Sequence, residues 1–87
     1  MSKPISELED WVFEYLKDET GEDLTREHLI SNYIDSLDVM NIVMEAEDVF
    51  YPGKEIPDNV VREWIQNMGT IGEFIDNVHS YAVRLQT

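Results

Sequence analysis

The sequence contains no cysteine, which excludes disulfide bonds and thiolate metal sites. Only four glycines and three prolines interrupt its 87 residues. No apolar run approaches the length of a membrane span, and the N-terminal residues 1–6 lack the apolar core of a signal peptide. No segment shows the two-residue period of a strand. We therefore expect a small helical protein that is cytoplasmic and not inserted in a membrane.

Basic residues are also scarce. Six Lys and Arg face nineteen Asp and Glu, for a formal net charge of -13, and Lys and Arg are absent from residues 27–53. Such a field repels nucleic-acid phosphates and anionic lipids and steers basic protein surfaces toward the chain. The alternative is an acidic face that only aids solubility. Nucleic-acid binding is disfavoured.

Amphipathic periodicity predicts an all-α four-helix bundle with a long first loop and a short third helix, as one domain spanning residues 1–87. The first helix is expected from Ser6 to Glu19, with Ser6 and Glu9 as a capping box and Gly21 as its stop. Its Trp11 and Tyr15 are interpreted as core anchors.

The later helices also carry boundary signals. Asp58 is the expected N-cap of the third helix and Gly69 its end. Thr70 and Glu73 form a second capping box, which opens the last helix. Gly72, in the first turn of that helix, indicates close packing.

The segment from Asp35 to Asp38 opens the second helix, which is expected to continue to Phe50. Asp35 is a good N-cap, and Asp38 lies three residues later, as in a capping box. Ser36 then lies at the helix N-terminus, where free backbone N–H groups and the helix dipole favour a phosphate. A serine hydroxyl in this position is well placed to carry a phosphodiester.

This second helix carries two apolar stripes. The first has helical spacing and is predicted to face the core: Val39, Ile42, Val43, Ala46, Val49 and Phe50. The second is Leu37, Met40 and Met44, among acids that include Glu47 and Asp48. Methionine adapts its shape to a partner, so this second stripe indicates a docking surface. The alternative is that all nine apolar residues belong to the core.

The chain resembles the acyl carrier protein family. The resemblance rests on Asp35-Ser36-Leu37 at mid-chain and extends over nearly the whole sequence, with matches at Asp38, Val43, Met44, Glu47, Phe50 and Ile56-Pro57-Asp58. It implies the acyl-carrier type of four-helix bundle. It also implies that Ser36 carries 4′-phosphopantetheine, whose thiol holds acyl groups as thioesters, so that the protein is a carrier and not an enzyme.

The resemblance further implies roles for individual residues. Asp35 would assist a metal-dependent phosphopantetheinyl transferase. Acyl-transferring and condensing enzymes with basic docking surfaces would contact Leu37, Asp38, Met40, Met44, Glu47 and Asp48. An acyl chain would lie between the helices, lined by Ile42, Val43, Ala46, Ile65 and Ile71. The protein would act as a monomer.

Some residues depart from the family pattern. Asn41 stands where an acid is common, and Ala46 replaces a larger apolar residue. These departures favour polyketide or other secondary-metabolite assembly over housekeeping fatty-acid synthesis. A peptidyl or aminoacyl carrier is a related possibility.

Two other classes of function compete with a carrier. In an acidic helical adaptor for a basic protein partner, Asp35 and Ser36 would serve only as helix caps. An enzyme is disfavoured because Ser36 has no base near it in sequence and the two histidines, His28 and His79, lie far apart. No His, Cys or spaced carboxylate cluster indicates a metal site.

Overall fold

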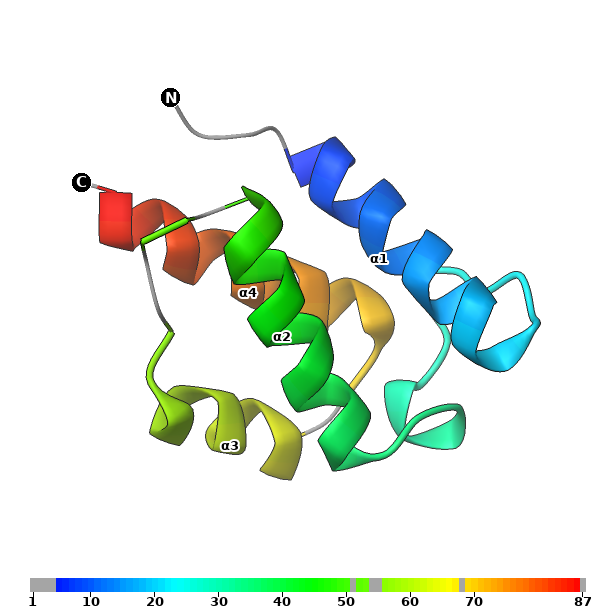
Figure 1. Ribbon diagram of the computed structural model, residues 1–87. Coiled ribbons are helices and arrows are strands. Elements are labelled where there is room, and N and C mark those ends of the chain that lie inside the picture. The colour runs from blue at the N-terminus through cyan, green and yellow to red at the C-terminus, as the bar shows by residue number, and fades with distance from the viewer. Residues whose placement is uncertain (1–4, 51, 54–55, 68, 87) are drawn as a thin grey trace.

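The computed structural model describes residues 5–50, 52–53, 56–67 and 69–86. Its helices are α1 (Ile5–Thr20), α2 (Ser36–Phe50), α3 (Asp58–Gln66) and α4 (Ile71–Gln86), with a short 3₁₀ turn, η1 (Ile30–Asn32). The described ranges contain no β-strand, and the predicted all-helical, four-helix class with a short third helix is confirmed. Helix α1 packs on α4 and α2, and α2 packs on α3. In Figure 1, α1 and α3 lie on opposite sides of α2.

The core is formed by the apolar stripes of the helices together with apolar residues of the loops. Each of its described members exposes 7% of its surface or less: Leu8, Val12, Leu16, Ile30, Ile34, Val39, Ile42, Val43, Ala46, Ile56, Val61, Ile71, Phe74, Ile75, Val78 and Ala82. No described polar or charged residue is buried. Burial of this apolar surface is the main force that holds the helices together.

The N-terminus of α2 is capped as the sequence predicts. The backbone N–H of Asp38 donates to Asp35 Oδ1 at 3.0 Å, and the N–H of Asp35 donates to Asp38 Oδ2 at 3.4 Å. The N–H of Val39 donates to the Asp35 carbonyl at 3.2 Å. This reciprocal cap fixes the first turn, so that Ser36 is the first residue of the helix.

The first loop is fastened to the start of α4 by backbone hydrogen bonds. The N–H groups of Ile71 and Gly72 donate to the carbonyls of His28 and Arg26, at 2.9 and 3.0 Å. A Cβ at Gly72 would lie 3.0 Å from the Cβ of Arg26, so the predicted close packing is confirmed. The capping box of Thr70 is also present, because the N–H of Glu73 donates to Thr70 Oγ1 at 3.2 Å.

The predicted cap of α1 is wrong. The helix already includes Ile5, so Ser6 is a helical residue and not its N-cap. The side chain of Glu9 instead pairs with Arg26 of the first loop. The Glu9 carboxylate, which the local pattern assigned to the cap, is therefore engaged in an ion pair with a residue far along the chain.

Two boundaries of α3 also differ from the prediction. Pro57, with φ −58° and ψ 142°, is the N-cap, and Asp58 is the first helical residue. The helix ends at Gln66, before the predicted stop at Gly69, and Asn67 forms its C-cap. The Asn67 side chain donates to the Glu63 carbonyl at 3.0 Å, which satisfies that helix end. Met68, which the helical period of the sequence places on the same apolar face as Trp64 and Ile65, lies outside the described residues.

Candidate functional site

Ser36 is exposed at the N-terminus of α2. The carboxylates of Asp35 and Asp38 beside it accept the backbone hydrogen bonds of the cap. The remaining N–H groups of the first turn, together with the helix dipole, favour a phosphate attached at this point. The structure therefore provides an accessible serine hydroxyl on a capped helix end.

A hollow of about 310 Å³ opens beside Ser36, between the start of α2 and α3. Helix α2 contributes Ser36, Leu37 and Met40 to its walls, and α3 contributes Arg62, Ile65 and Gln66. The wall thus combines apolar side chains with one cation and one amide. Its volume suits an extended chain of a few carbon and heteroatom groups lying between the helices.

The sequence analysis does not predict Arg62 or Gln66 as residues of this site. The signal was present, because Arg62, Ile65 and Gln66 are spaced three and four residues apart and so share one face of a helix. Only the packing of α3 beside α2 shows that this face borders Ser36.

The second apolar stripe of α2 is largely exposed. Leu37 exposes 68% of its surface and Met44 exposes 60%, while Met40 is half-buried at the hollow. The alternative in which all nine apolar residues of α2 belong to the core is therefore wrong. Of the acids predicted to dock partners, Asp48 is exposed and Asp38 and Glu47 are half-buried.

One predicted core residue of α2 is not in the core. Val49 exposes 53% of its surface, and Phe50 is only partly buried. Val49 lines an open groove between α2 and α1, so its side chain has no helix packed over it. The helical period alone predicts which residues share a face, but not how far a neighbouring helix covers that face.

The residues predicted to line an acyl cavity fall into two groups. Ile42, Val43, Ala46 and Ile71 are at most 1% exposed and belong to the core. Ile65 is half-buried and lines the hollow beside Ser36. The structure therefore brings four of the five together inside the bundle and places the fifth at the serine.

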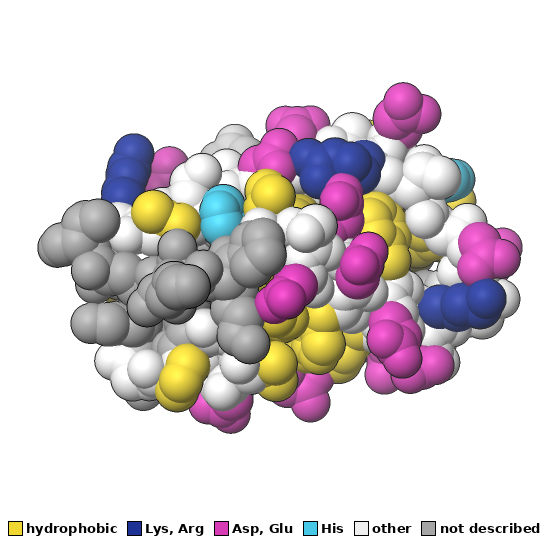
Figure 2. Space-filling view, turned by 90° about the horizontal axis from the view of Figure 1, so that it is seen from above, with side chains coloured by type: hydrophobic (Ala, Val, Ile, Leu, Met, Phe, Trp, Pro, Cys, Tyr) yellow, Lys and Arg dark blue, Asp and Glu magenta, His cyan; other side chains and the backbone are white. Residues whose placement is uncertain are grey.

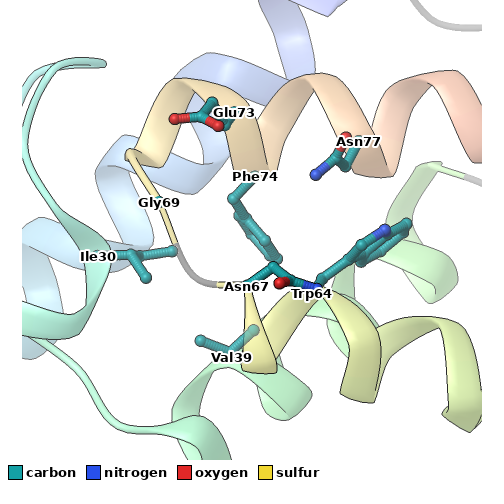
Figure 3. A pocket seen from close by; sticks show the side chains of 8 residues that line it. All are labelled: Ile30, Val39, Trp64, Asn67, Gly69, Glu73, Phe74 and Asn77. Atoms are coloured by element: carbon teal, nitrogen blue, oxygen red, sulfur yellow. The ribbon is translucent and has the colours of Figure 1, made fainter.

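A separate, smaller hollow of about 30 Å³ lies among α2, α3, α4 and η1. Figure 3 shows its lining side chains, with Phe74 extending from α4 toward α3: Ile30, Val39, Trp64, Asn67, Gly69, Glu73, Phe74 and Asn77. This volume holds about one or two water molecules. None of the five predicted cavity residues lines it.

The histidine of the first loop is engaged locally. Its Nδ1 accepts a hydrogen bond from the backbone N–H of Thr25 at 2.9 Å, and the His28 ring packs edge-on against Tyr33. Within the described residues, no group of three or more His, Asp or Glu side chains is placed to hold a metal ion. None of the helices in the described ranges combines the length and apolarity needed to cross a bilayer.

Comparisons of this chain with protein-family models, with curated proteins and with solved structures give no match. Function is therefore inferred from the residues around Ser36 and from the charge of the surface. Figure 2 shows one face of that surface, where acidic side chains lie around apolar ones.

Proposed function

We propose that this protein is an acyl carrier protein that holds acyl groups on a 4′-phosphopantetheine arm attached to Ser36. The observation that carries the proposal is the exposed serine at the capped end of α2, next to a hollow between α2 and α3. The resemblance of Asp35-Ser36-Leu37 and the following acidic helix to the acyl carrier family supports the same function.

The residues present fit such an arm. The Ser36 hydroxyl would form the phosphodiester, and the α2 N-terminus would favour its negative charge. Arg62 supplies a cation in the adjoining hollow, which would attract the phosphate of the arm. Met40 and Ile65 offer apolar contacts to the organic part of the arm. When bound, the arm supplies the thiol that carries acyl groups as thioesters.

The docking surface of this carrier would be the side of α2 that bears Leu37 and Met44. Leu37 and Met44 are exposed apolar anchors of the kind that become desolvated when a partner binds. The absence of Lys and Arg from residues 27–53 makes this side attractive to basic surfaces. The partners would be a phosphopantetheinyl transferase, followed by acyl-transferring and condensing enzymes of a fatty-acid or, preferentially, a polyketide pathway. As a carrier the protein would act as a cytoplasmic monomer.

Acyl chains are proposed to enter between the helices from the Ser36 side. Ile65 stands at that entrance, while Ile42, Val43, Ala46 and Ile71 are closely packed inside. An acyl group would therefore have to separate these four side chains as it enters. Ala46, the smallest of them, leaves the most space for this movement.

The direct test is the intact mass of the protein after incubation with a promiscuous phosphopantetheinyl transferase, Mg²⁺ and coenzyme A. The proposal predicts a gain of one phosphopantetheine unit in the wild type, none in Ser36→Ala, and a full gain in Ser80→Ala. Ser80 is a matched control because it is an exposed serine on α4. No gain in the folded wild type, with a control carrier modified in the same tube, would favour the acidic adaptor instead.

A second assay separates acyl from peptidyl or aminoacyl loading. The modified protein is incubated with acyl-transferring or amino-acid-activating enzymes, and the mass of the thioester is read directly. Loading by acyltransferases alone is the expected result.

A further inference from the structure

An open groove of about 430 Å³ lies between α1 and the C-terminal half of α2. Helix α1 contributes Trp11 and Tyr15 to it, and α2 contributes Glu45, Asp48 and Val49. Helices α1 and α3 lie on opposite sides of α2, so this groove and the Ser36 hollow occupy different sides of the same helix (Figure 1).

The aromatic wall of the groove is held in place before any partner arrives. The Trp11 and Tyr15 ring centres are 5.7 Å apart, and the Phe50 ring packs edge-on against Trp11 at 5.8 Å. Trp11 and Tyr15 are half-buried and pack against the core on one side. Binding of a partner would therefore cost little side-chain entropy at these rings.

The α2 wall of the groove is acidic. Glu45 and Asp48 are exposed, and neither Lys nor Arg occurs between residues 27 and 53. Burial raises the pKa of Tyr15 above its usual value, and the carboxylates of Glu45 and Glu19 raise it further. The negative potential of the acids thus reaches the aromatic wall itself.

We propose that this groove is a second docking site, which binds a basic segment of a partner protein by taking a Lys or Arg side chain against the aromatic rings and beside the carboxylates. A guanidinium or ammonium group is attracted both to the face of a Trp or Tyr ring and to carboxylates. The partly exposed Val49 offers apolar contact to the stem of such a side chain. A second copy of this chain is a poor occupant, since its net charge of -13 repels its own surface.

The proposal goes beyond the carrier function and does not depend on the arm. The groove contains neither Ser36 nor any other residue of the hollow beside it. A Ser36→Ala protein should therefore bind the basic segment as the wild type does, so that failure of one proposal is distinguishable from failure of the other.

The two tryptophans provide the test. Trp11 lines the groove, whereas Trp64 lines the smaller hollow among α2, α3 and α4. We would titrate the protein with a tetra-arginine peptide, following both indole N–H signals by NMR after assigning them with Trp64→Phe. A saturable shift of the Trp11 signal, with the Trp64 signal unmoved, is expected. Shifts confined to the backbone amides around Ser36 and Met44 would overturn the proposal.

Variants separate the groove from general attraction between opposite charges. Glu45→Gln with Asp48→Asn should weaken peptide binding about fivefold or more, as the loss of two charged contacts implies. The matched control, Asp58→Asn with Glu63→Gln, removes the same charge from exposed positions of α3 and should change affinity by less than about twofold. Equal weakening by both pairs would overturn the proposal. So would spermidine binding at the groove as tightly as the peptide, because that would identify a small polycation as the ligand.

Discussion

Arg26 connects three parts of the molecule through one side chain. Its guanidinium pairs with Glu9 of α1 and with Asp76 of α4, and it also donates to the Gly72 carbonyl at 3.4 Å. These acceptors keep its pKa above the usual value for arginine, Glu9 contributing most. The first loop, which leads directly into the Asp35–Asp38 cap, is thereby attached to both α1 and α4.

The first prediction concerns this residue. Arg26→Gln should lower the free energy of unfolding by about 1 kcal/mol, because two partly exposed ion pairs are lost and each contributes a few tenths to 1 kcal/mol. Urea denaturation measures the change. Arg62→Gln makes the same change in charge at an exposed position of α3 and should alter stability by less than about 0.5 kcal/mol. Equal effects of the two substitutions would show that net charge, and not the Arg26 contacts, is responsible.

The second prediction concerns the phenol of Tyr15. Burial first, and then Glu45 and Glu19, raise its pKa above its usual value of 10.0. The folded protein therefore holds this proton more tightly than the unfolded chain does. The stabilisation is complete below pH 10 and is lost as the pH rises through the folded-state pKa.

The titration can be followed by tyrosinate absorbance, as the difference between the wild type and Tyr15→Phe. Glu45→Gln should move the Tyr15 titration to lower pH, though not fully to the usual value, because burial remains. Asp48→Asn, in the same groove, should move it less. An unchanged titration in Glu45→Gln would contradict the placement of that carboxylate beside the phenol.

At the scale of the helices, two of the three capping pairs that the three-residue spacing predicts are present. The pairs Asp35–Asp38 and Thr70–Glu73 are present as predicted. The predicted capping box of Ser6 and Glu9 is absent. Glu9 pairs instead with Arg26, which lies seventeen residues away in a loop that packs against α1 only in the folded state. Local spacing contains no information about such a contact.

The same limit explains the surface of α2. Leu37 and Met44 are exposed, as their position among acidic residues in the sequence indicates. The exposure of Val49 depends on where α1 lies across the end of α2, and the position of Arg62 beside Ser36 depends on the packing of α3. Both are matters of tertiary packing, which periodicity does not determine.

The third prediction tests how α4 is fastened to the first loop. In an ordinary helix, replacing glycine by alanine gains about 1 kcal/mol. At Gly72 a new Cβ would lie 3.0 Å from the Arg26 Cβ and 3.2 Å from its backbone oxygen, so Gly72→Ala should instead destabilise the protein by about 1 kcal/mol. Ser80→Ala, at an exposed position of α4, should be neutral or slightly stabilising. A gain in stability from Gly72→Ala in urea denaturation would show that the loop does not approach α4 this closely.

At the scale of the whole molecule, α2 separates two different surfaces. One side, with α3, holds the exposed serine and its hollow, and the other, with α1, holds the aromatic and acidic groove. The net charge of -13 makes both sides attractive to basic proteins. If both proposals hold, the protein binds a partner through one side of α2 while the arm on Ser36 serves another enzyme on the other side.

The central claim is that Ser36 is the attachment point of the arm. The most direct measurement is peptide mapping by tandem mass spectrometry of the wild-type protein after treatment with a phosphopantetheinyl transferase, Mg²⁺ and coenzyme A. We expect one phosphopantetheine on the peptide that contains Ser36 and none on any other serine. An unmodified Ser36 peptide from folded protein, or modification at a different serine, would contradict it.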